Sequence, residues 1–104
     1  MAVVVTGERD PTVLWRERIE LVGGTLPRQP YHAVADLSPT GKQGAQLIAR
    51  VEKAAAKRAV AATARIIATH GVSAVGIVGG GRTIPENLER VLASHAYLHA
   101  AEGE

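Results

Sequence analysis

The stretch that decides the fold is Gln43–His70, QGAQLIARVEKAAAKRAVAATARIIATH, the longest helical pattern in the chain. Apolar residues recur in it at helical spacing, at Leu47, Val51, Ala55 and Ile66. Such a stripe between charged positions is typical of a helix with one buried face. Gly71 ends the pattern, and His70 in the last turn suits the negative end of the helix dipole. We therefore predict one long helix over residues 43–70.

Three segments before this helix are predicted to be strands joined as an antiparallel meander. They are Ala2–Thr6, Thr12–Val22 and Tyr31–Leu37. The first is a β-branched run, and the second alternates apolar with charged residues as a sheet with one solvated face requires. Ser38 is a candidate N-cap for the following helix, with Pro39 at its first position.

Two elements are predicted after the long helix. Ser73–Val78, SAVGIV, is apolar throughout and predicts an inner, parallel strand, buried on both faces. A final helix is expected from Ile84–Pro85 to Glu102, with Thr83 as its N-cap and Glu86 completing a capping box. The predicted fold is a single α/β domain over residues 1–104, with the element order βββαβα.

This order of elements resembles the first two thirds of a ribonuclease H-like domain. The resemblance covers most of the chain and is topological. Nucleases of that fold have a carboxylate in the first strand, and others on the following helix and near the fourth strand. Here the first strand is AVVVT, without an acid before Glu8, and the fourth ends in glycines. Only Glu52 falls where an acid would be useful, so the resemblance extends to the fold and not to the catalytic carboxylates.

The composition narrows the class of protein. The chain has 104 residues, 46% of them hydrophobic, with no Phe, one Trp and two Tyr. A core of small side chains buries little area per contact, so association of subunits is an expected source of stability. The net charge is +2 without a dense basic run, and the absence of Cys excludes disulfides and thiolate metal sites. The apolar start MAVVV is too short for a signal peptide or membrane span, and we expect a soluble, cytoplasmic protein.

A glycine loop after the fourth predicted strand is the first candidate site. It comprises Gly79, Gly80, Gly81, Arg82 and Thr83. Glycines let backbone N–H groups approach an anion, a helix N-terminus adds positive partial charge, and Arg82 offers a bidentate clamp. The loop therefore predicts binding of a phosphate-bearing ligand, either a nucleotide or nucleic acid. It is neither a P-loop nor GxGxxG, and a tight strand-to-helix connection explains the same glycines.

The end of the chain, SHAYLHAAEGE, contains the second candidate. His95, His99 and Glu102 fall at i, i+4 and i+7, on one helix face. Two imidazoles and a carboxylate can ligate zinc or another divalent metal. The same spacing continues an apolar stripe from Leu88, so this face equally suits burial against the core or a second subunit.

A third group is His32 with Asp36, which point to the same side of the predicted strand and could act in acid–base chemistry. Four basic residues along the long helix are interpreted as a solvated face, with phosphate contact as a secondary role. They are Lys42, Lys53, Lys57 and Arg58.

Three functions stay open on the sequence alone. The first is a domain that binds a phosphate-bearing ligand at Gly79–Thr83. The second is a non-catalytic interaction module that forms a homo-oligomer, in which a partner chain completes the sheet by strand addition. The third is a divalent-metal-dependent hydrolase. Since the sequence stops at HAAEGE without a polar tail, a further strand or helix is expected to follow.

Overall fold

A computed structural model describes residues 1–37, 41–79 and 82–103, and its longest element is helix α2, Gly41–His70. This confirms the predicted long helix. Its N-terminal half buries Gly44, Ile48 and Val51. The helix ends at Gly71, whose φ of 63° is a left-handed conformation that glycine adopts without steric cost, and whose N–H donates to the carbonyl of Ile67 at 2.9 Å. The predicted cap, Ser38 and Pro39, lies outside the described residues.

The segment predicted as the third strand is a helix, α1, Pro30–Leu37. The expectation of a strand was wrong because the buried positions follow a helical period, Pro30 and Val34, rather than alternating. Val34 is 1% exposed and lies at the centre of the helical core. The amide of Ala33 donates to the carbonyl of Gln29 at 3.0 Å, so the helical bonding begins before Pro30. Proline at the first helical position is favoured because its fixed φ suits a helix start.

Strands β1, Ala2–Thr6, and β2, Thr12–Glu17, form an antiparallel hairpin. The first strand is confirmed, whereas the second ends at Glu17 and not at Val22. The register shifts between Val4 and Val5, which pair with Trp15 and Val13 respectively. Such a bulge increases the local twist of the pair.

The predicted inner parallel strand over Ser73–Val78 is also wrong. Residues 72–79 run in an extended path, and the sheet in the described part of the chain contains only β1 and β2. The three-stranded meander and the βββαβα order are therefore replaced by ββαααα. A strand needs a neighbour for its backbone hydrogen bonds, and the described chain gives this segment none. The resemblance to ribonuclease H-like domains depended on the predicted βββαβα order of elements, which differs from the observed order.

The single C-terminal helix of the prediction is divided in two, α3, Leu88–Leu92, and α4, His95–Glu102. Asn87 caps α3 by accepting from the amide of Arg90, and Ser94 caps α4 by accepting from the amide of Tyr97. Each of these side chains accepts a hydrogen bond from an amide in the first turn of its own helix. Such a cap favours the start of a helix at that position. Thr83 is thus not the N-cap.

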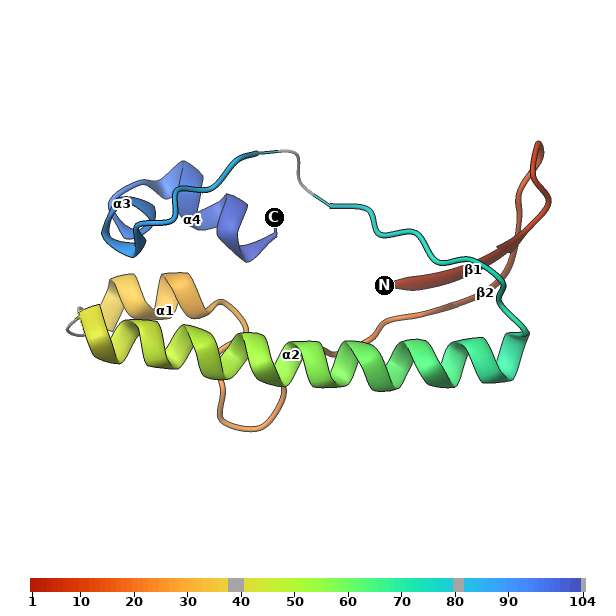
Figure 1. Ribbon diagram of the computed structural model, residues 1–104, viewed down its shortest axis with the longest axis horizontal. Helices are drawn as coiled ribbons and strands as arrows, with labels where there is room; N and C mark the ends of the chain where they lie inside the picture. Colours follow the sequence, from red (N-terminus) through yellow and green to blue (C-terminus); the bar gives the residue numbers. More distant parts are fainter. Residues whose placement is uncertain (38–40, 80–81, 104) are drawn as a thin grey trace.

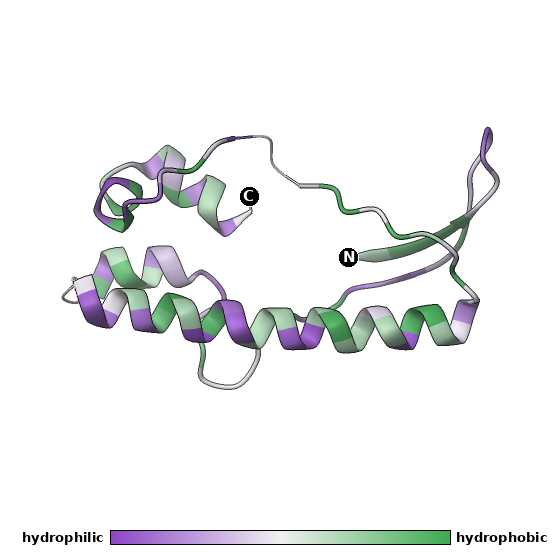
Figure 2. Cartoon of the chain, in the orientation of Figure 1, coloured by the Kyte–Doolittle hydropathy of each residue, from purple (hydrophilic) through white to green (hydrophobic). Residues whose placement is uncertain are grey.

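The helices α1, α3 and α4 gather beside the N-terminal half of α2, and the hairpin lies beside its C-terminal half (Figure 1). Apolar residues alternate with charged ones along α2 (Figure 2). Arg65 of α2 forms an ion pair with Glu17 at 2.9 Å, and His70 contacts the ring of Trp15 at a centroid distance of 4.8 Å. These contacts attach the hairpin to α2 in a molecule of 48 × 28 × 17 Å.

The hydrophobic core lies almost wholly in the helical half. Its buried hydrophobic residues there are Val34, Ile48, Val51, Val91 and Leu98, whereas the hairpin contributes Val4. None of the helices within the described ranges combines the length and apolar character needed to cross a membrane.

Candidate metal centre

Helix α4 brings His95 and His99 together. The Ser94 cap starts the helix immediately before His95, so the two histidines are one helical turn apart and project from the same face. Their Nε2 atoms lie 2.9 Å apart and their ring centroids 4.2 Å apart. The pair is thus within hydrogen-bond distance, and the predicted alignment on one face is what the structure shows.

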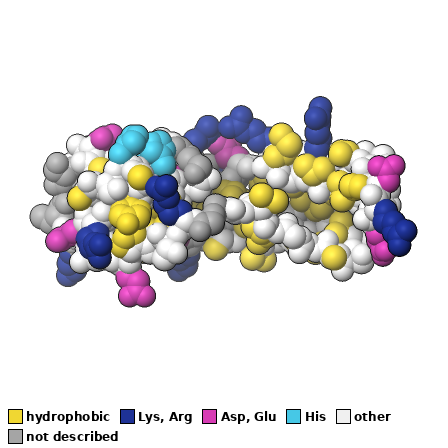
Figure 3. Space-filling view, turned by 90° about the horizontal axis from the view of Figure 1, so that it is seen from above, with side chains coloured by type: hydrophobic (Ala, Val, Ile, Leu, Met, Phe, Trp, Pro, Cys, Tyr) yellow, Lys and Arg dark blue, Asp and Glu magenta, His cyan; other side chains and the backbone are white. Residues whose placement is uncertain are grey.

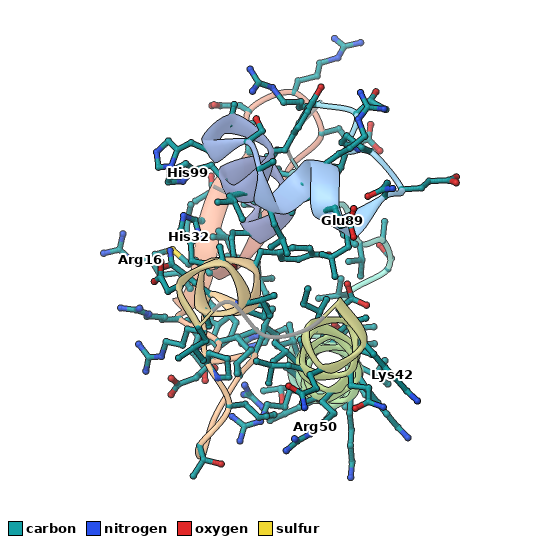
Figure 4. All side chains as sticks on the ribbon, turned by 90° about the vertical axis from the view of Figure 1, so that its left-hand side faces the viewer. Arg16, His32, Lys42, Arg50, Glu89 and His99 are labelled. Atoms are coloured by element: carbon teal, nitrogen blue, oxygen red, sulfur yellow. The ribbon has the colours of Figure 1, made fainter. Side chains whose placement is uncertain are left out.

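Helix α1 adds His32 to this pair. Its ring centroid lies 5.0 Å from that of His99 and 6.2 Å from that of His95. One ligand atom from each of the three histidines lies within 4.8 Å of the others. Figure 4 shows His32 and His99 on the same side of the molecule, and Figure 3 shows histidine side chains gathered at its surface. We name His32, His95 and His99 the histidine cluster.

Glu102 lies behind this cluster and binds the start of α1. Its Oε1 atom accepts from the backbone amides of Tyr31 and His32, at 2.6 and 3.1 Å. These amides belong to the first turn of α1, where N–H groups have no partner inside the helix. The carboxylate side chain is only 3% exposed. The structure therefore makes Glu102 a cap for α1, a different place from the ligand position predicted beside His95 and His99.

The same carboxylate oxygen lies 3.6 Å from Nδ1 of His32. This Nδ1 atom is buried and has no hydrogen-bond partner within the described part of the chain. A buried polar atom without a partner costs free energy, and a small rotation of the imidazole toward Glu102 would satisfy it. A proton on Nδ1 directed at Glu102 leaves Nε2 with its lone pair, which is the form a metal ion requires.

The dimensions of the cluster can be compared with those of a zinc site. Zinc–nitrogen bonds of 2.0–2.1 Å in a tetrahedron separate the nitrogens by about 3.3 Å. In this structure the Nε2 atoms of the two α4 histidines are 2.9 Å apart, and one ligand nitrogen from each of the three histidines lies within 4.8 Å of the other two. The three nitrogens therefore lie within about 1.5 Å of the spacing that a single zinc ion requires.

The other predicted site residues are not brought to the cluster as a set. Gly79, Arg82 and Thr83 are exposed, and Gly80 and Gly81 lie outside the described residues. The helix that was to supply positive partial charge begins at Leu88, beyond the Asn87 cap, and not next to the loop. The phosphate hypothesis thereby loses its helix N-terminus and stays a prediction that rests on the loop itself.

Asp36 is exposed on α1, while His32 turns toward α4, so the structure gives the predicted His32–Asp36 pair no contact among the described interactions. Four basic residues of α2 were predicted to form a solvated face, and all four are exposed. They are Lys42, Lys53, Lys57 and Arg58. Arg58 also donates to the carbonyl of Glu20 at 3.3 Å.

An open pocket of about 210 Å³ lies between α1, α2 and the segment before α3, lined in part by Tyr31, Ile48, Glu52 and Pro85. Burial raises the pKa of Tyr31, and the neighbouring Glu52, which accepts from its hydroxyl at 3.3 Å, raises it further. No histidine of the cluster lines this pocket.

Comparison with known proteins adds no relative. No protein-family model, no curated protein and no solved structure matches the chain. The function is therefore argued from the histidine cluster and its surroundings.

Proposed function

We propose that this protein binds one divalent transition-metal ion, preferably zinc, through His32, His95 and His99. The observation that carries the proposal is the convergence of three imidazoles within 4.8 Å, from helices α1 and α4, which are far apart in the sequence. Adjacent histidines on one helix are a consequence of local spacing. A third histidine supplied by α1 is not, because only the tertiary fold brings it there.

The chemistry of the ligand set favours zinc over calcium or magnesium. Imidazole nitrogen suits zinc, copper, nickel and iron, whereas calcium and magnesium prefer oxygen. Three protein ligands leave a fourth tetrahedral position for water, the arrangement of zinc sites that are not closed by a fourth side chain. His95 is exposed, so an ion and its water can enter from solvent.

Glu102 supports such a site without ligating the ion. Metal-bound histidines commonly donate their second ring N–H to a carboxylate, which fixes the ring and raises its basicity. Glu102 is placed for this role because it is 3.6 Å from Nδ1 of His32 and is itself held by two amides of α1. The bound ion would join α1 to α4 and stabilise the helical half by mass action.

Metal-dependent hydrolysis, considered from the sequence, needs a substrate cavity beside the ion. The pocket at Tyr31 and Glu52 does not include the cluster, so the geometry favours ion binding over a reaction. A phosphate-bearing ligand at the loop stays an independent hypothesis, in which Arg82 is the cationic contact.

Calorimetric titration of the chelator-treated protein with zinc tests the proposal. We expect one ion per chain, and His32→Ala, His95→Ala and His99→Ala each to weaken binding at least tenfold. Cobalt in place of zinc should give the strong visible absorption of tetrahedral coordination. Binding should also weaken as the pH falls, because protons compete for the ligand nitrogens.

The chain has a matched control in its fourth histidine, His70, which contacts Trp15 away from the cluster. His70→Ala should leave zinc affinity unchanged. Wild-type protein that binds no zinc would overturn the proposal. So would undiminished binding in His32→Ala, since the ion would then be held by the adjacent α4 pair alone.

A further inference from the structure

The chain exposes more surface than a folded monomer of its mass. Its accessible surface is 8008 Å², whereas a monomer of 10.9 kDa exposes about 5,600 Å², so the excess is roughly 2,400 Å². The radius of gyration, 16.5 Å, likewise exceeds the value of about 13 Å for this chain length. Obligate dimers bury about 1,000–2,500 Å² on each subunit. The excess therefore equals one subunit's share of a large interface.

The exposed apolar residues are concentrated away from the helical core. On the hairpin they include Val5, Val13 and Leu14, and on the C-terminal half of α2 they include Val60 and Ile67. Figure 3 shows hydrophobic side chains gathered over this half of the molecule. We name the surface of the hairpin, the C-terminal half of α2 and residues 72–79 the apolar half. Exposed apolar side chains gathered on one part of a molecule are typical of a protein interface.

The apolar half also contains backbone segments without strand partners in the described structure. A two-stranded hairpin is marginally stable by itself, and both of its outer edges are open in the described structure. Residues 73–78 have a strand-forming sequence and an extended path (Figure 1), but they pair with no strand within the described ranges. Ile77 is 93% exposed and Val78 is 103% exposed. Unpaired N–H and C=O groups beside such side chains are a template for strand pairing.

We propose that a second copy of this chain covers the apolar half, with residues 73–78 of the two copies paired as antiparallel strands across a twofold axis. An antiparallel pair of identical strands has this symmetry by construction, so one segment forms both sides of the contact. The sequence SAVGIV contains no charge, and self-pairing therefore opposes no like charges. Strand β2, by contrast, would bring the charged side chains of Arg16 and Glu17 into such a contact.

The test is sedimentation velocity over a range of micromolar concentrations, in chelator so that metal cannot bridge two chains. The wild-type chain should be a dimer. Ile77→Glu should raise the dimer dissociation constant at least about tenfold, because it places a charged side chain from each copy in an otherwise apolar contact. Since Ile77 is almost fully exposed, the substitution should leave the circular dichroism of the helices unchanged.

Leu37 provides the matched control, because it is 73% exposed but lies at the end of α1, in the helical half. Leu37→Glu should leave the dimer intact. A wild-type chain that is monomeric throughout, or a dimer that survives Ile77→Glu, would overturn the proposal. A monomer would direct attention to a partner of different sequence.

Single cysteines test the pairing itself, because the chain has none of its own. Cysteine is placed at each of residues 73–78 in turn. The residue nearest the twofold axis should form an intermolecular disulfide under mild oxidation, since opposed Cα atoms in antiparallel strands are about 4.5–5.5 Å apart. Leu37→Cys should not crosslink. A dimer in which none of the six positions crosslinks would refute strand pairing.

Discussion

Replacing Glu102 with alanine should destabilise the protein more than any other single change at its charged residues. The carboxylate accepts from two amides of the first turn of α1, and its side chain is only 3% exposed. Loss of an N-cap costs about 0.5–2 kcal/mol, and hydrogen bonds to a charged group contribute about 1.5–3 kcal/mol each. Since the freed amides of Tyr31 and His32 are half-buried and regain some contact with water, we expect a loss of about 2–3 kcal/mol.

Glu102→Gln separates the charge from the hydrogen bonds. The glutamine side chain keeps an oxygen that can accept from the same amides, but it loses the favourable interaction of a negative charge with a helix N-terminus. That interaction contributes about 0.3–1 kcal/mol at exposed positions and up to about 2 kcal/mol when partly buried. The expected loss is about 1 kcal/mol, midway between wild type and Glu102→Ala.

The measurement is urea unfolding followed by circular dichroism of the helices, in chelator, because a bound ion would add stability by linkage and mask the change. In a separate thermal unfolding experiment, a loss of 2–3 kcal/mol corresponds to a fall in Tm of about 10–20 °C for a domain of this size. Glu86→Ala is the control, since Glu86 is exposed in the same half of the molecule. If Glu102→Ala were as stable as Glu86→Ala, the carboxylate would not bind α1 and the capping argument would be refuted.

Three further predictions follow from the same structure. In Tyr97→Phe, which leaves Tyr31 as the only tyrosine, the ultraviolet titration should show a pKa above 10.0, and Glu52→Gln should lower it. Because the Tyr31 phenol ionises more readily in the unfolded chain, its contribution to the free energy of unfolding should be constant below pH 10 and decrease above it. A Tyr31 titration midpoint at the ordinary pKa of 10.0 would contradict the burial of this side chain. Ser94→Ala should cost about 1 kcal/mol of unfolding free energy and Ser94→Asp should restore it, since either oxygen side chain caps α4; equal stability of all three would argue against the break before His95. Gly41→Ala should stabilise α2 by about 0.5–1 kcal/mol, whereas Gly71→Ala, at φ 63°, should destabilise it by about 1 kcal/mol, and the same sign at both positions would contradict the helix end.

Local patterns predicted the elements whose stabilising contacts are near in sequence. The stripe through Leu47 and Val51 and the glycine at 71 are properties of adjacent turns, so α2 was predicted closely. Tyr31–Leu37 is short enough to fit period two as well as period 3.6. What favours the helix there is Pro30 at its start and Glu102 from the far end of the chain, and the second of these has no local signal.

The residues of the histidine cluster likewise differ in whether local sequence could predict their position. The spacing of His95 and His99 placed both on one face, because i and i+4 are neighbours on any helix. His32 was assigned to a strand with Asp36, and its approach to α4 depends on how α1 packs. A signal was present in the sequence, since Pro30 at a helix start would have put His32 in the first turn. SAVGIV failed as a prediction for another reason: its composition suits a strand, but the described chain offers no neighbouring strand to complete the hydrogen bonds.

The two proposals concern opposite ends of α2, and this separation makes them independent. The histidine cluster is built on α1 and α4 beside the N-terminal half of the helix, whereas residues 73–78 follow its C-terminal end (Figure 1). After α2 the chain turns back over the hairpin, and no histidine of the cluster belongs to the pairing segment or to the hairpin (Figure 1). Each metal centre would then be complete within one chain, because all three histidines belong to it. Chelation should consequently loosen the contact of α1 with α4 without dissociating the dimer, and Ile77→Glu should dissociate the dimer without releasing the metal. A change that abolished both properties together would have to act through α2 itself, the only described element that extends from the metal-binding half to the apolar half.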